Sequence, residues 1–178
     1  RAARPPRGRL AAVAAGVAAC AALLVVAGSA RRSATVPDTV RVKGSGAVTV
    51  LVERGGVTRS ALPGDRVAPG DVLGFVVRTP TPAYVAVLGR DARSTVTVYV
   101  PATATMERVD AIAGRQLDAA IELDATLGDE TVLAFFCDAP VPIAALVEAV
   151  RDAGTTLPAV AGCGADRIVL VKEAMGSR

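Results

Sequence analysis

The sequence predicts a mainly β domain, a sandwich or open barrel of about seven or eight short strands with one packed α-helix, preceded by a single transmembrane helix. Apolar and polar residues alternate with period two in several short runs, and Gly, Pro and Asp separate these runs. Aromatic residues make up only 3% of the chain, so the core must consist largely of Val, Leu and Ala, and Val favours strands. An uncharged stretch at residues 10–30 predicts the transmembrane helix.

The stretch at residues 10–30 is bounded by Arg9 and Arg31. As a helix it would span about 31 Å, which matches the hydrocarbon core of a bilayer. Four arginines precede it, two follow it directly, and none of the 17 acidic residues comes before Asp38. The positive-inside rule therefore favours, by a small margin, a cytoplasmic N-terminal flank.

This orientation gives five segments. They are a basic cytoplasmic flank (1–9), the transmembrane helix (10–30), a linker (31–39), an extracytoplasmic β-rich domain (40–174) and a short tail (175–178). The expected location is the inner (cytoplasmic) membrane, crossed once, with the C-terminal domain in the periplasm.

Three alternatives for the apolar stretch stay open. A signal peptide would use the same basic start and be cleaved after the small residues Gly28, Ser29 and Ala30. The run from Val17 to Cys20 resembles a lipobox, although apolar residues continue beyond the cysteine. A buried soluble helix is the third alternative, and the absence of a polar face argues against it.

The first half of the body has the pattern of strands joined by tight turns. Val48, Val50 and Val52 alternate with other residues, and Gly55–Gly56 permits a hairpin that returns over 57–61. Two Pro-Gly-Asp turns, at 63–65 and 69–71, lead into a strand at 72–78.

The second half predicts one clear hairpin and one helix. The hairpin joins 84–88 to 95–100, with Val96, Val98 and Val100 on one face. Ile143, Leu146, Val147 and Val150 share one face of a helix that Gly154 ends. Further strands are expected at 117–123, 130–136 and 168–171.

Cys137 and Cys163 lie outside the apolar stretch and are the predicted disulfide pair. A bridge between them would close a loop of about 27 residues and stabilise the fold by about 3–4 kcal/mol. It would also place the body in an oxidising compartment. Two separate buried thiols are the alternative, whereas a zinc site needs more soft ligands than these two.

No catalytic residue, cofactor or metal ligand is predicted. Histidine is absent from the sequence, which excludes His-based triads, His bases and His ligands here. Asp118, Glu122 and Asp124 would share a face of one strand, which favours a solvated surface over a calcium or acid–base site. Tyr84 and Tyr99 are expected to form a cross-strand aromatic pair, with a ligand patch as the alternative.

Composition also argues against nucleic-acid binding. From Ser33 onward the chain has 14 basic and 17 acidic side chains, so its high pI comes from the arginines around the apolar stretch. A nucleic-acid surface needs clustered Lys and Arg within the folded part. The glycine-rich runs at 44–46 and 162–164 lack phosphate-loop spacing and are expected to be loops.

The segment from Pro63 to Pro101 carries a family resemblance. It has a Gly64–Asp65 turn before a strand, Tyr84 opening the next strand, Asp91 in the turn, and then Val98-Tyr99-Val100-Pro101. In this order it resembles the bacterial family numbered four-three-eight-four among the domains of unknown function, over roughly residues 40–173. The resemblance implies a membrane-anchored regulator of an extracytoplasmic-function sigma factor. In such proteins a cytoplasmic zinc-binding anti-sigma segment precedes the helix, and here it would lie before Arg1.

The expected function is thus a non-catalytic sensing or protein-interaction domain outside the membrane. Its expected partners are the membrane and a protein, which the resemblance implies to be a sigma factor reached through a segment before Arg1. The alternatives are an envelope structural or adhesion module without a signalling role, and a hydrolase that uses paired carboxylates.

Overall fold

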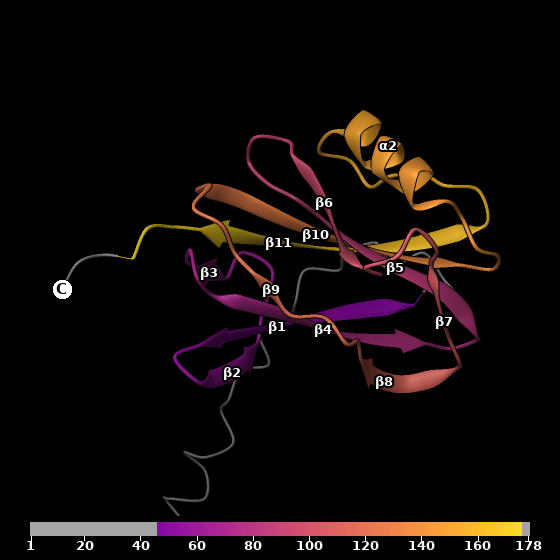
Figure 1. Ribbon diagram of the computed structural model, residues 1–178, viewed down its shortest axis with the longest axis horizontal. Coiled ribbons are helices and arrows are strands. Elements are labelled where there is room, and N and C mark those ends of the chain that lie inside the picture. Colours follow the sequence, from indigo (N-terminus) through magenta and orange to yellow (C-terminus); the bar gives the residue numbers. More distant parts are fainter. Residues whose placement is uncertain (1–45, 176–178) are drawn as a thin grey trace, which may run out of the picture. The chain divides into compact units, whose positions relative to one another are not determined.

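The computed structural model describes residues 46–175, which fold into two β-sheets with one helix on the outside (Figure 1). The mainly β prediction with one helix is confirmed. The predicted transmembrane helix at 10–30 lies outside the described residues. Among the residues that are described, no helical segment has the length and apolarity needed to cross a bilayer.

The first sheet has the strand order β2-β1-β4-β8, and β9 also pairs with β4. All pairs within it are antiparallel. Its strands are β1 (Ala47–Arg54), β2 (Val57–Ser60), β4 (Val72–Thr79), β8 (Ile112–Gln116) and β9 (Ile121–Glu122).

The second sheet has the order β3-β11-β10-β5-β6, and β7 also pairs with β5. Only the short β3 runs parallel to its neighbour, β11. Its strands are β3 (Arg66–Val67), β5 (Ala83–Arg90), β6 (Val96–Val100), β7 (Glu107–Val109), β10 (Gly128–Cys137) and β11 (Cys163–Lys172).

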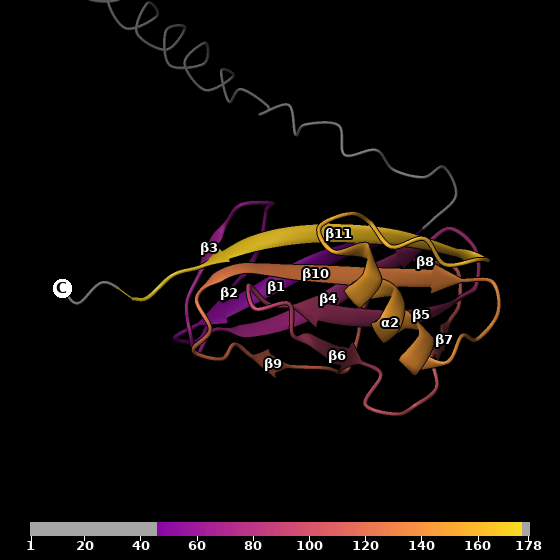
Figure 2. The same cartoon turned by 90° about the horizontal axis from the view of Figure 1, so that it is seen from above.

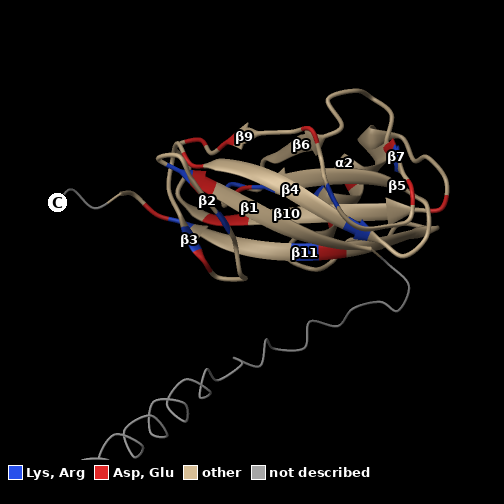
Figure 3. Cartoon of the chain, turned by 90° about the horizontal axis from the view of Figure 1, so that it is seen from below, with Lys and Arg blue, Asp and Glu red and all other residues tan. Residues whose placement is uncertain are grey.

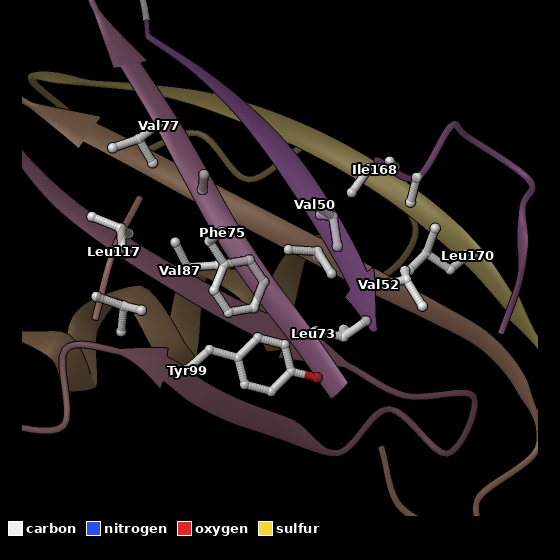
Figure 4. Packing of buried hydrophobic residues seen from close by; sticks show 14 of the residues in the cluster. Val50, Val52, Leu73, Phe75, Val77, Val87, Tyr99, Leu117, Ile168 and Leu170 are labelled. Carbon is white, nitrogen blue, oxygen red and sulfur yellow. The ribbon is translucent and has the colours of Figure 1, made fainter. Parts of the chain in front are cut away.

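The main core lies between the two sheets. Alternate residues of β1 and β4, such as Val50 and Phe75, meet alternate residues of β10 and β11, such as Val132 and Leu170. Figure 4 shows Val50, Phe75 and Leu170 among the packed side chains. Each of these side chains is fully buried. Burying a side chain of this size contributes about 1.5–3 kcal/mol, so this layer provides most of the apolar stabilisation.

Helix α2 (Ile143–Ala153) lies over the other face of the β10 sheet, as Figure 2 shows from above. A second core lies between this helix and the sheet. Leu146 and Val150 of the helix pack against Leu133 and Phe135 of β10. The predicted helical face and the stop at Gly154, which has φ 56°, are both observed. The β10 strand is therefore covered on both faces, which explains its nearly continuous apolar sequence.

Two sequence predictions about β6 and its neighbours are wrong. The register shifts between Val87 and Leu88, where β5 pairs with β6, and this bulge turns Tyr99 and Val100 into the same core. Val100 therefore leaves the face that Val96 and Val98 occupy. Tyr84 packs in the helix-side core, so the expected pair with Tyr99 does not form.

The predicted strand at 117–123 is also wrong. The chain instead forms β8 before Leu117 and the short β9 after it. The Leu117 amide donates to the Phe75 carbonyl at 2.9 Å, and the Ala119 amide turns back to the Leu117 carbonyl at 2.9 Å. Leu117 and Leu123 both enter the core, as a continuous strand would also have placed them, because they are six residues apart. The turn at 117–119 separates β8 from β9, so the predicted strand does not run continuously.

Candidate functional site

Two charged side chains occupy inward-facing positions at one end of the inter-sheet core. Glu130 of β10 is in phase with Val132, and Lys172 of β11 is in phase with Leu170, so strand alternation turns both charges inward. Glu130 is 3% exposed and Lys172 is 2% exposed. Buried charges are rare in proteins unless they are paired.

The two charges are paired with each other and with two further side chains. The Lys172 Nζ donates to Glu130 Oε2 at 2.8 Å and to Asp124 Oδ1 at 2.6 Å. The Tyr99 hydroxyl donates to Glu130 Oε1 at 2.7 Å. We call Tyr99, Asp124, Glu130 and Lys172 the charge network. It joins β6, β10, β11 and the loop after β9.

Protonation in the network follows from these contacts. Burial acts to lower the pKa of Lys172, but its hydrogen bonds to Asp124 and Glu130 outweigh burial and raise that pKa above its ordinary value. The hydrogen bond from Lys172 lowers the pKa of Asp124. Burial and the neighbouring Glu130 charge raise the pKa of Tyr99. At neutral pH the network therefore holds an ammonium ion, an ionised Asp124 and a neutral phenol.

Gly89 makes room for the tyrosine. The Tyr99 ring stacks on Phe75 with centroids 5.6 Å apart (Figure 4). It also lies directly over Gly89 of β5. A Cβ added to Gly89 would lie 2.1 Å from the Tyr99 hydroxyl oxygen and 2.1 Å from Cζ. The absence of a side chain at position 89 therefore allows Tyr99 to reach Glu130.

We expect Gly89→Ala to lower the free energy of unfolding by about 1–3 kcal/mol, because the Tyr99 ring must move and overpacking has this cost. Urea unfolding of both proteins measures the difference. Gly74→Ala in β4 is the matched control, since its new Cβ would meet Leu51 at 3.7 Å, an ordinary contact. Equal stability of the two variants would contradict the role given to Gly89.

A cavity of about 170 Å³ opens beside the charge network. The network forms part of its wall, together with the β5–β6 hairpin and β9. Acidic segments next to β9 are visible in Figure 3. The lining residues are Gly89, Asp91, Thr95, Thr97, Tyr99, Ile121, Glu122, Leu123, Asp124, Glu130 and Lys172.

The structure brings together two of the three carboxylates in the predicted strand face. Glu122 and Asp124 line the cavity, whereas Asp118 does not. All three are exposed, so the solvated-surface interpretation fits Asp118. Within residues 46–175, no three His, Cys, Asp or Glu side chains are grouped so that they could hold a metal ion.

Sequence reasoning missed the charge network. A signal for it was present, because Glu130 and Lys172 each lie at one end of a strongly apolar strand, in the same phase as the core residues Val132 and Leu170. A charge in that phase indicates a buried, paired group. What the sequence could not supply is the sheet order that makes β10 and β11 neighbours.

Cys137 and Cys163 form a disulfide. They are directly opposite each other on β10 and β11, at the far end of these strands from Glu130 and Lys172. The bridge closes the base of the excursion that carries α2. The predicted 162–164 loop is shorter than expected, because β11 already begins at Cys163.

Comparisons of the chain with protein-family models, with curated proteins and with solved structures find no match. The family resemblance carried by residues 63–101 stays a prediction.

Proposed function

We propose that residues 40–174 form a non-catalytic sensing and protein-interaction domain, held outside the bacterial inner membrane by the helix at 10–30. The observation that carries this proposal is the buried charge network beside a cavity. At neutral pH its lysine is protonated and its tyrosine is neutral, so neither group is a base. Its two carboxylates, Asp124 and Glu130, already accept hydrogen bonds from Lys172 and Tyr99.

The physical argument concerns the energetic cost of the network. Removing two charges from water costs several kcal/mol per ion, and apolar side chains of similar size often give an equally or more stable core. The neighbouring inward positions, Val132 and Leu170, are apolar. A buried ion pair that also lines a cavity is therefore better explained by ligand binding than by stability alone.

Two features support a location outside the membrane. The Cys137–Cys163 bridge is typical of an oxidising compartment. The charge-free stretch at 10–30 has the length of a membrane span. The family resemblance adds a direction for the signal, toward a sigma factor in the cytoplasm through a segment that would precede Arg1.

The location is tested by fusing reporters to the C-terminus of the full chain in a bacterial host. We expect alkaline phosphatase, which needs an oxidising compartment, to be active, and green fluorescent protein to be dark after Sec export. The Cys137 and Cys163 thiols should resist alkylation until a reductant is added. A bright fluorescent fusion with an inactive phosphatase fusion would overturn the proposed location.

The sensing role is tested by comparing proteins crosslinked to the full chain in living cells. Lys172→Met combined with Glu130→Leu replaces the ion pair by apolar groups, and Thr79→Val is the control. Thr79 is also buried (1% exposed) but does not line the cavity. If the domain senses a ligand, the double variant should change the amount of cytoplasmic regulator that is crosslinked to the chain, and Thr79→Val should not. An envelope structural or adhesion module predicts the same envelope partners for all three proteins, and that result would overturn sensing.

A further inference from the structure

We infer that the cavity binds a neutral polyhydroxylated molecule, a single saccharide ring or the terminal ring of a glycan. This inference rests on the proposed function. It names the class of ligand that the domain would sense. Four features of the cavity wall carry it, namely its mixture of donors and acceptors, an open donor on Lys172, its charge and its apolar floor.

The wall combines side chains that only accept hydrogen bonds with one that only donates. Ionised carboxylates accept, the ammonium donates, and the hydroxyls of Thr95 and Thr97 do both. A ligand that satisfies such a wall must offer O–H donors and oxygen acceptors a few ångströms apart. Neighbouring hydroxyl groups on one ring have this property, because each oxygen both donates and accepts.

Lys172 has capacity for one further hydrogen bond. An ammonium carries three N–H donors, and the hydrogen bonds formed among residues 46–175 use two, those to Asp124 and Glu130. The Nζ is part of a side chain that is 2% exposed and lines the cavity. A ligand oxygen in the cavity could accept the third N–H while the network stays intact.

The charge of the wall argues against an anionic ligand. The lining contains one lysine, so its formal charge is three negative when the four carboxylates Asp91, Glu122, Asp124 and Glu130 are counted. Phosphate or a carboxylate would therefore be repelled. A metal ion has no group of three suitable side chains among the described residues. A neutral ligand avoids both difficulties.

The remaining walls suit a ring with a C–H face. Ile121 and Leu123 contribute apolar surface, and Tyr99 is held in place by its stacking on Phe75. The cavity volume of about 170 Å³ is below the usual range for drug-sized ligands, which begins at about 300 Å³. One small ring fits this scale, whereas a disaccharide would have to leave its second ring outside.

The inference is tested on the full chain in lipid nanodiscs by saturation-transfer NMR titration. D-Glucose is the neutral probe and glucuronate, a ring of similar size, is the anionic one. Putrescine, a smaller open-chain diamine, is the cationic probe. We expect saturation transfer from the protein to glucose and none to glucuronate. Binding of putrescine without glucose, or the absence of glucose binding at tens of millimolar, would overturn the inference.

Substitutions in the cavity wall test whether glucose binds in this cavity. Glu122→Gln should weaken glucose binding about threefold to tenfold, the effect of one lost hydrogen bond, and Thr97→Val should act in the same direction. Both residues are exposed, so the fold should tolerate the changes. Glu148→Gln, on the exposed side of α2, is the matched control. Equal effects of Glu122→Gln and Glu148→Gln would overturn the site assignment.

A linear glucose tetramer distinguishes the two sources of the ligand. Tighter binding of the tetramer than of glucose supports a glycan chain end, and equal binding supports a free sugar. The reporter fusions decide the location of the domain independently. An active phosphatase fusion without glucose binding would thus remove this inference and leave the proposed location standing.

Discussion

Lys172→Met is expected to lower the free energy of unfolding by about 3–5 kcal/mol, the cost of leaving a buried charge unpaired. The substitution would remove the ammonium but leave the Glu130 carboxylate, which is 3% exposed, without its ionic partner. Urea unfolding followed by circular dichroism measures the change. Arg115→Met is the matched control, because the Arg115–Glu107 pair is partly exposed and such pairs contribute about 0–1 kcal/mol.

The double variant Lys172→Met/Glu130→Leu separates the contribution of the charges to stability from the contribution of packing. Removing both charges should recover most of the lost stability, since no unpaired ion remains in the core. The Tyr99 hydroxyl then loses its acceptor, so Tyr99→Phe should recover a further part. A double variant as unstable as Lys172→Met would show that Lys172 acts through its packing and would contradict the ion-pair account.

The same network makes stability fall at alkaline pH. The pKa of Lys172 in the folded state lies above its ordinary value of 10.5, so the stability from its charge is fully present below that pH. This stability is lost as the pH rises through the folded-state pKa. Tyr99, whose pKa is also raised, acts in the same direction above its ordinary value of 10.0. A Lys172→Met/Glu130→Leu/Tyr99→Phe variant should show a smaller alkaline loss.

Removing the disulfide by Cys137→Ala/Cys163→Ala is expected to cost about 3–4 kcal/mol, because the unfolded chain gains the entropy of a loop of about 27 residues. The sequence separation of the two cysteines is 26. Urea unfolding with and without dithiothreitol measures the effect. Reductant should destabilise the native sequence by a similar amount and leave the double variant unchanged. Equal stability of oxidised and reduced protein would contradict a stabilising role for the bridge.

The sequence predicted the elements whose apolar pattern is local. The helix at 143–153 and the hairpin around Gly55–Gly56 follow from short-range periodicity and turn chemistry, and both are observed. The strands at 66–67 and 107–109 were missed, since each is held by partners far along the chain. The bulge that turns Tyr99 inward depends on β5 and likewise leaves no local sequence signal.

The candidate site was predicted only in part, for the same reason. Glu122 and Asp124 were singled out, but on a single continuous strand that does not form. Lys172 lies outside the predicted carboxylate cluster, although it ends β11 in the phase of the buried Leu170. The three hydrogen bonds of the charge network join residues that are 31 to 48 positions apart, so only the fold shows that they meet.

The place of β11 inside its sheet has a consequence for synthesis of the protein. This strand lies between β3 and β10, so neither neighbour can complete its backbone hydrogen bonds before residues 163–172 are made. Until then one edge of β10 stays unpaired, and the core lacks the side chains Ile168 and Leu170 that β11 supplies. Pairings over such long sequence separations form slowly and expose intermediates to aggregation. A nascent chain that stalls before Cys163 would therefore depend on chaperones to stay in solution.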